Sequence, residues 1–137
     1  MSIARSAAIA AAVLFLLLAA FQLALALGAP WGRAAYGGAV ERPGTGLRIA
    51  SAVAVLVWTG VALVVLRRSG IETWAPLPTS WLPIAIWVIV AYLAIGVVMN
   101  AISPSPLERA IWVPFILAAG ALTIVVAVTS AAQSGDS

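Results

Sequence analysis

Residues 6–27 read SAAIAAAVLFLLLAAFQLALAL, an apolar run without a charged side chain. Charge is absent from four long intervals, which are 6–32, 49–66, 73–107 and 110–135. On insertion scales a charge at the bilayer centre costs roughly 2.5–3.5 kcal/mol, whereas each Leu, Ile, Val or Phe gains roughly 0.3–0.6 kcal/mol. Each interval therefore predicts a membrane-crossing helix, and we expect helices over about 6–27, 49–66, 81–102 and 106–130.

The composition supports the same fold over the whole chain. Hydrophobic residues make up 64% and charged residues 8%, whereas soluble domains have about 45–50% apolar and about 25% charged residues. Only helices and closed barrels satisfy backbone polar groups in lipid, and the unbroken apolar runs favour helices. We therefore predict a single transmembrane domain over 1–137, an all-α four-helix bundle of up-down topology with both termini on the same side.

Local signals mark several helix ends. Gly28 follows the first run and Gly70 follows the second, each at the position of a C-terminal cap. Ser105, with Glu108 three residues later, fits a capping box at the start of the fourth helix. These ends define loop 1 (28–47), loop 2 (69–80) and the short loop 3 (103–105), and the glycine-rich loop 1 predicts turns without regular structure.

The first helix has a second interpretation as a cleaved signal peptide. Arg5 would supply the charged start, and Ala24-Leu25-Ala26 resembles a cleavage site. Signal peptides have apolar regions of about 7–15 residues, and this run is longer. We therefore expect an uncleaved anchor.

Several function classes are disfavoured. The chain has no cysteine and no histidine, so thiolate and imidazole chemistry are excluded. We identify no catalytic, cofactor-binding or metal-binding residues and predict no cofactor and no enzyme activity. The net charge of +3 is better explained by membrane topology than by nucleic-acid binding. Proton-coupled pumps need ionisable residues within their spans, and none lies there, so a small transporter or channel is less favoured than a binding or assembly role.

Polar side chains inside the spans are few, and each lies in a stripe of small residues at helical spacing. The stripes contain Gln22 in the first span, Ser51 and Thr59 in the second, Tyr92, Gly96 and Asn100 in the third, and Thr123 in the fourth. Small and polar residues of this kind form helix–helix interfaces in membranes. The stripes therefore predict either the packing seam of the bundle or, less favoured, a ligand site.

The helix topology indicates where a ligand site would lie. The first and third helices cross in the same direction, so Gln22 and Asn100 approach the same membrane face, where loops 1 and 3 also lie. If the protein has a ligand or partner site, we expect it on this loop 1/loop 3 face. The candidate residues are Gln22, Trp31, Tyr36, Arg48, Tyr92, Asn100, Glu108 and Arg109.

Three strings resemble a known group of proteins. They are LGAPWGRAAYGG (27–38), RPGTGLRIAS (42–51) and the pattern N-x-x-S-x-S-x-x-E-R-x-x-x-x-P (100–114). Together they are similar to short, uncharacterised four-helix integral membrane proteins of GC-rich bacteria. The resemblance spans most of the chain and implies the fold and the loop 1/loop 3 face, but it implies no activity.

Two functions remain about equally favoured. One is binding of a small apolar or lipid-like molecule, between the helices or at the loop 1/loop 3 face. The other is an accessory or assembly subunit of a larger membrane complex. We expect membrane lipids as partners. Protein partners would be another membrane protein or a second copy of the chain, and we expect no nucleic acid to bind. We expect a multi-pass protein of the bacterial inner membrane. Its arginines nearly balance, with three on the side of the termini and four, Arg33, Arg42, Arg48 and Arg109, on the other. Cytoplasmic termini are favoured because the Arg67-Arg68 pair adjoins a helix end and Arg5 precedes the first helix.

Overall fold

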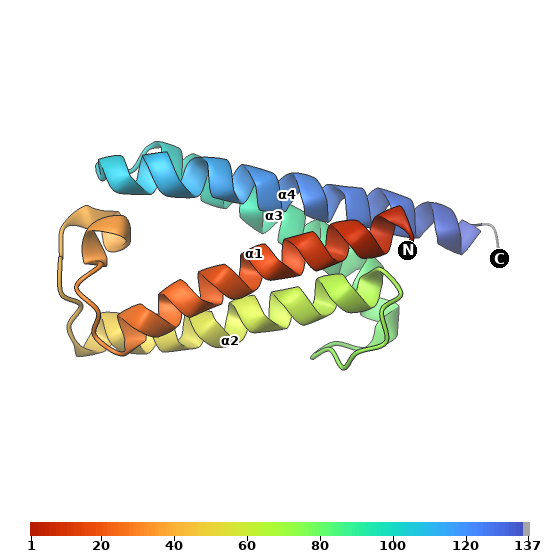
Figure 1. Cartoon of the computed structure of the whole chain (residues 1–137), viewed down its shortest axis with the longest axis horizontal. Coiled ribbons are helices and arrows are strands. Elements are labelled where there is room, and N and C mark those ends of the chain that lie inside the picture. The colour runs from red at the N-terminus through yellow and green to blue at the C-terminus, as the bar shows by residue number, and fades with distance from the viewer. Residues whose placement is uncertain (136–137) are drawn as a thin grey trace.

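The computed structural model describes residues 1–135, and it consists of helices and loops (Figure 1). Its long helices are α1 (Ile3–Ala26), α2 (Thr45–Arg68), α3 (Leu82–Ala101) and α4 (Pro106–Gly135). Short 3₁₀ turns are η1 (Gly32–Ala34), η2 (Tyr36–Gly38) and η3 (Thr79–Trp81). The helices run alternately up and down, and α1 begins at the end of the bundle where α4 finishes (Figure 1). The predicted all-α, four-helix fold is confirmed, and no strand occurs in residues 1–135.

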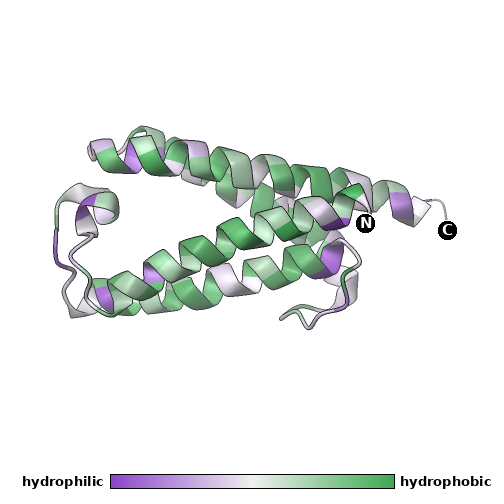
Figure 2. Cartoon of the chain, in the orientation of Figure 1, coloured by the Kyte–Doolittle hydropathy of each residue, from purple (hydrophilic) through white to green (hydrophobic). Residues whose placement is uncertain are grey.

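All four long helices are long and apolar enough to cross a membrane. Hydrophobic residues cover them over most of their length, while hydrophilic residues gather toward the helix ends and loops (Figure 2). Large apolar side chains also stay exposed on the outside, among them Leu56 at 74% and Ile84 at 71%. A water-soluble protein would not expose such a surface so widely, so this is a multi-pass membrane protein.

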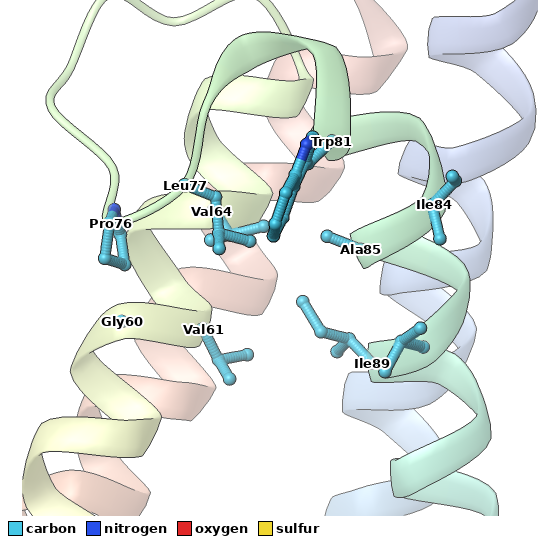
Figure 3. A pocket seen from close by; sticks show the side chains of 10 residues that line it. Gly60, Val61, Val64, Pro76, Leu77, Trp81, Ile84, Ala85 and Ile89 are labelled. Atoms are coloured by element: carbon cyan, nitrogen blue, oxygen red, sulfur yellow. The ribbon is translucent and has the colours of Figure 1, made fainter.

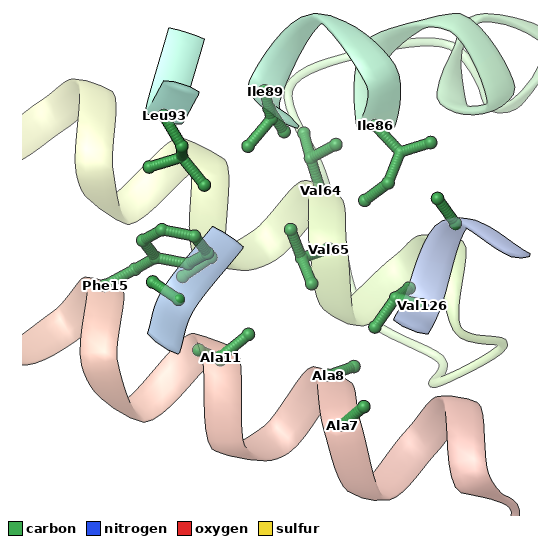
Figure 4. Packing of buried hydrophobic residues seen from close by; sticks show 14 of the residues in the cluster. Ala7, Ala8, Ala11, Phe15, Val64, Val65, Ile86, Ile89, Leu93 and Val126 are labelled. Atoms are coloured by element: carbon green, nitrogen blue, oxygen red, sulfur yellow. The ribbon is translucent and has the colours of Figure 1, made fainter. Parts of the chain in front are cut away.

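The bundle consists of two antiparallel pairs, α1 with α2 and α3 with α4, and α1 also packs on α4. The contact of α1 depends on small residues in its first half, where Ala4, Ala8 and Ala11 are completely buried. Small side chains allow helices in lipid to approach closely, and Val126 of α4 packs beside this alanine face (Figure 4). Toward loop 1 the two pairs lie farther apart (Figure 1).

The burial of the polar stripes differs from one helix to the next. Ser51 of α2 and Thr123 of α4 are buried, as the packing-seam interpretation predicts. The α3 stripe is different, because Tyr92 is 55% exposed and Asn100 is partly exposed. The buried face of α3 is instead apolar and consists of Leu82, Ile86, Ile89 and Leu93. The stripe of Tyr92 and Asn100 is therefore not the packing seam of this helix.

Both predicted glycine caps are confirmed. Gly28 has a φ of 93°, and its N–H donates to Leu25 O at 3.0 Å, while Ala29 N–H donates to Ala24 O at 2.9 Å. Gly70, with a φ of 89°, ends α2 through the same pair of bonds. This is the Schellman motif, in which a residue in the left-handed conformation satisfies the last helical carbonyls.

The helix bounds differ from the sequence prediction, most clearly for α2. This helix begins at Thr45 and ends at Arg68, whereas the charge-free interval covers only 49–66. Its terminal arginines lie within the helix, because long arginine side chains can reach the membrane surface from helical positions. α1 likewise starts at Ile3, where the Ser2 hydroxyl accepts the Arg5 N–H at 3.2 Å. Charge marks the edge of the hydrocarbon layer and not the end of helical hydrogen bonding.

Candidate binding chamber beneath loop 1

Loop 1 folds back toward α4 and is fastened there by three hydrogen bonds. The indole Nε1–H of Trp112 donates to Ala34 O at 2.6 Å, and the Ser105 hydroxyl donates to Arg33 O at 2.5 Å. The third bond runs from the Gly37 N–H to Glu108 Oε1 at 3.0 Å. The prediction of a loop without regular structure is therefore wrong in part, since η1 and η2 form where these bonds hold the chain.

The backbone of η2 requires an unusual conformation. Tyr36, Gly37 and Gly38 have consecutive positive φ angles of 53°, 74° and 76°. For tyrosine this conformation costs of order 1–3 kcal/mol, and its hydroxyl group helps to hold it by hydrogen bonds to Leu47 O at 3.3 Å and to the Ser51 hydroxyl. Loop 1 is thus attached to α2 on one side and to α4 on the other.

Glu108 connects loop 1, loop 3 and α4. Its side chain is buried, and its two carboxylate oxygens accept hydrogen bonds from Gly37 N–H and from the Ser103 hydroxyl. Half of the predicted capping box is present, because Ser105 Oγ accepts the Glu108 N–H at 3.3 Å. The second bond of a capping box, from the Ser105 N–H to the Glu108 carboxylate, is absent. The Ser105 N–H donates instead to Ser103 Oγ at 3.1 Å. Glu108 therefore has a structural role in fixing the loops.

A cavity of about 270 Å³ lies beneath loop 1, between the two helix pairs. All four long helices and loop 1 contribute to its wall. The lining residues are Leu18, Phe21, Gln22, Ala34, Ala35, Tyr36, Ala54, Trp58, Tyr92, Asn100, Glu108, Trp112 and Ile116. We call this cavity the chamber. A second hollow of about 470 Å³, between loop 1 and the end of α3, shares Tyr36, Asn100 and Glu108 with it and forms a vestibule.

Aromatic rings bridge the helix pairs around the chamber. Phe21 of α1 meets Trp112 of α4 edge to face, with ring centroids 4.9 Å apart. Trp58 of α2 lies against Tyr92 of α3 at 5.7 Å and also stacks on Phe15. These rings occupy the part of the bundle where the helix pairs separate, whereas alanines fill the opposite end. The width of the chamber follows from this change in side-chain size along α1.

Polar groups without a protein partner face the chamber. Within residues 1–135 the Gln22 amide and the Tyr92 hydroxyl make no hydrogen bond. Asn100 donates from Nδ2 to Gly96 O of its own helix at 2.8 Å, and its Oδ1 accepts no bond from these residues. The unpaired atoms of Gln22 and Asn100 are not fully buried, so a bound molecule or water can reach them. The chamber wall therefore offers donors and acceptors beside aromatic surfaces.

The structure brings together five of the eight candidate residues, since Gln22, Tyr36, Tyr92, Asn100 and Glu108 all line the chamber.

The other three candidates lie outside the chamber. Trp31 stacks on Phe21 with ring centroids 6.1 Å apart and is half exposed. Arg48 Nε donates to Ala26 O at 2.8 Å at the end of α1, and Arg109 donates to Ser103 O at 2.5 Å.

Sequence reasoning missed the two tryptophans that form much of the chamber wall, Trp58 and Trp112. Their positions relative to the membrane were visible in the sequence, because Trp58 lies deep in a span and Trp112 near a helix end. The sequence did not show that both side chains point toward the bundle interior. A helix that is apolar on all sides gives no hydrophobic periodicity from which to deduce the inward face. The available signal was spacing: Trp58 lies seven residues, or two helical turns, after the polar Ser51.

The charges near the chamber do not form a metal centre. No group of three or more Asp or Glu side chains suited to a metal ion occurs in the part of the chain that the structure describes. Arg33 and Glu41 form an exposed ion pair at 3.7 Å on the outside of loop 1. Such a surface pair contributes little to stability.

Fold and chamber together define a small multi-pass membrane protein whose four helices surround a hollow near one membrane face. Comparison with protein-family models, curated proteins and solved structures finds no match to this chain. Any conclusion about function therefore depends on the chemistry of the chamber itself.

Proposed function

We propose that this membrane protein binds a small amphipathic molecule in the chamber, without transforming it chemically. The observation that supports the proposal is the combination of aromatic walls with unpaired polar groups at Gln22, Tyr92 and Asn100. Ligand pockets are mostly apolar and contain a few polar groups that orient the guest. The volume of about 270 Å³ suits a compact ring system.

The expected binding mode follows from the positions of these groups. The apolar body of the ligand lies between Trp58 and Trp112, and its polar group bonds to the amides of Gln22 and Asn100. The ligand would enter through the vestibule beside Asn100, at the loop end of the bundle. Glu108 already bonds to loops 1 and 3, so it holds the wall and does not contact the ligand directly.

Titration of the purified protein in micelles tests this proposal. The probes are 2-naphthol and naphthalene, which differ only by one hydroxyl group. We expect saturable binding of 2-naphthol and loss of binding in Ala54→Phe, which fills the chamber. Ala50→Phe, on the exposed surface of the same helix, is the control and should bind as the unaltered protein does.

A second variant tests the polar contact. Gln22→Leu should weaken 2-naphthol binding about twofold to tenfold, because a net hydrogen bond contributes about 0.5–1.5 kcal/mol. Naphthalene binding should not weaken. Equal binding by Ala54→Phe and Ala50→Phe would contradict the proposal. Absence of saturable binding together with a stoichiometric co-purified membrane protein would favour the accessory-subunit alternative.

We further propose that the termini and loop 2 lie in the cytoplasm, with the chamber near the outer face of the bacterial inner membrane. The arginines that adjoin spans are nearly balanced, because Arg48 and Arg109 lie at the chamber face. The adjacent pair Arg67 and Arg68 at the end of α2, with Arg5 before the first apolar run, supports this orientation. Reporter fusions at Ser69 and Gly38 test it: only the Ser69 fusion should report a cytoplasmic location, and the reverse pattern would invert the orientation.

A further inference from the structure

An apolar groove of about 580 Å³ lies between α2 and α3 beneath loop 2, at the end of the bundle away from the chamber (Figure 3). Side chains of both helices border it, and loop 2 closes one end (Figure 3). The lining residues are Gly60, Val61, Val64, Pro76, Leu77, Trp81, Ile84, Ala85, Val88 and Ile89. The groove thus lies on membrane-spanning helices and has an apolar wall.

The dimensions of the groove suit a hydrocarbon chain. Its lining on η3 and α3 extends from Trp81 to Ile89, which corresponds to about 12 Å along a helix. This is more than a third of a hydrocarbon core about 30 Å thick. Gly60 adds width on the opposite wall, where a Cβ atom would already be 3.6 Å from the Pro76 side chain.

A polar hollow of about 420 Å³ lies at the end of α2 and is lined in part by Arg67, Arg68 and Thr79. Arg67 is engaged, because it donates to Thr73 O at 2.6 Å and to the Thr79 hydroxyl at 3.2 Å. Arg68 forms no hydrogen bond or ion pair within residues 1–135, and its Nε atom is buried. Among residues 1–135, no carboxylate lines this hollow. The guanidinium of Arg68 therefore favours an anion in this hollow.

The groove and the polar hollow are lined by neighbouring residues of α2 and of η3. On α2, Val61, Val64 and Arg68 follow one another at helical spacing, and the first two line the groove while the third lines the hollow. On η3, Trp81 lines the groove and Thr79 the hollow. An occupant that fills both must have an apolar chain and an anionic head.

We propose that this composite site holds one anionic phospholipid. Its phosphate lies at the guanidinium of Arg68 with the Thr79 hydroxyl nearby, and one acyl chain occupies the α2–α3 groove. A guanidinium can bond to two phosphate oxygens at once, and Trp81 lies at the level where aromatic rings meet lipid headgroups. The lipid would then fix loop 2 and stabilise the weaker contact between α2 and α3. The proposal is independent of ligand binding in the chamber.

The test uses the full chain reconstituted in phosphatidylcholine vesicles that contain a minor fraction of phosphatidylglycerol. After mild detergent extraction, native mass spectrometry counts the lipids that each chain retains. We expect one phosphatidylglycerol per chain and about tenfold lower retention in Arg68→Gln, the scale of a lost charge-assisted hydrogen bond. Arg42→Gln is the control, because Arg42 is exposed on the opposite membrane face and the change in charge is the same.

A second pair of variants tests the apolar half of the site. Ala85→Trp fills the groove and should displace the lipid, whereas Ala91→Trp lies on the exposed surface of the same helix and should not. If Ala85→Trp does not fold, Val88→Trp at the exposed rim of the groove replaces it.

Three results would overturn the proposal. Equal retention of phosphatidylcholine and phosphatidylglycerol would exclude headgroup selection. Equal losses in Arg68→Gln and Arg42→Gln would show a general effect of charge. Displacement of the lipid by inorganic phosphate alone, with unchanged retention in the groove-filling variant, would show a simple anion site without a role for the groove.

Discussion

A methyl group at Gly38 should weaken the attachment of loop 1 to the start of α4. The Cβ atom of Gly38→Ala would lie 2.7 Å from the Cβ and 2.9 Å from the Oγ of Ser105, closer than packed atoms allow. Ser105 would have to move, although its hydroxyl accepts the first-turn N–H of Glu108 and donates to Arg33 O. The substitution therefore acts on the helix cap and the loop anchor together.

The loss of unfolding free energy in Gly38→Ala can be estimated from three contributions. The left-handed conformation costs a non-glycine residue roughly 1–2 kcal/mol, loss of a serine cap costs about 1 kcal/mol, and loss of a hydrogen bond costs about 0.5–1.5 kcal/mol. Gly38→Ala should thus lower the free energy of unfolding by about 2.5–4.5 kcal/mol. Gly37→Ala is the matched control, because Gly37 has a similar φ of 74° but open space around its Cβ position. It should lower this free energy by only about 1–2 kcal/mol.

Unfolding in bicelles by added denaturing detergent, followed by tryptophan fluorescence, measures both values. A double-mutant cycle then isolates the contact. In a Ser105→Gly background the clashing atoms are gone, so the cost of Gly38→Ala should fall to that of Gly37→Ala. The reasoning would be refuted if Gly37→Ala were the more damaging substitution, or if the cost of Gly38→Ala were unchanged in the Ser105→Gly background.

Further outcomes follow from the same structure. Trp112→Phe keeps an aromatic ring but removes the 2.6 Å bond to loop 1, so it should lower the unfolding free energy by about 1 kcal/mol in the bicelle assay. Trp87→Phe, half exposed on the outside of α3, should leave the unfolding free energy within about 0.5 kcal/mol of the original; similar losses in both variants would contradict the assignment. If Asn100 formed a hydrogen bond between helices, Asn100→Leu would cost about 0.5–2 kcal/mol. Because the bond lies within α3, we now expect a change below about 0.5 kcal/mol together with weaker 2-naphthol binding, and a large loss of stability would show that Asn100 holds helices together.

The sequence by itself determined the number of helices, their direction and many of their ends. Charge-free runs fixed the four spans, since a charge in the hydrocarbon layer is costly. Gly28 and Gly70 marked helix ends because a left-handed residue at that position suits glycine. These signals are local: each depends on a few neighbouring residues or on the solvent, and none requires a partner distant in the chain.

The inward faces of the helices could be predicted only where side-chain size varied. The alanine face of α1 was recognisable in the sequence and is buried. On α3 the buried Ile86 and Ile89 have the same chemistry as the exposed Ile84 and Ile95. Lipid and protein interior are equally apolar, so hydrophobic periodicity does not separate them.

Only the tertiary structure decided that the polar and aromatic residues enclose a chamber. Its wall combines Gln22 with Trp112, residues 90 positions apart in sequence. The cover depends on bonds from Trp112 and Ser105 to carbonyls of loop 1, across 78 and 72 positions. Arg48 and Arg109 carry charge near the same membrane face, yet each bonds to a nearby carbonyl and stays outside. The orientation of a side chain about its helix depends on contacts between helices, and those contacts exist only when the bundle is assembled.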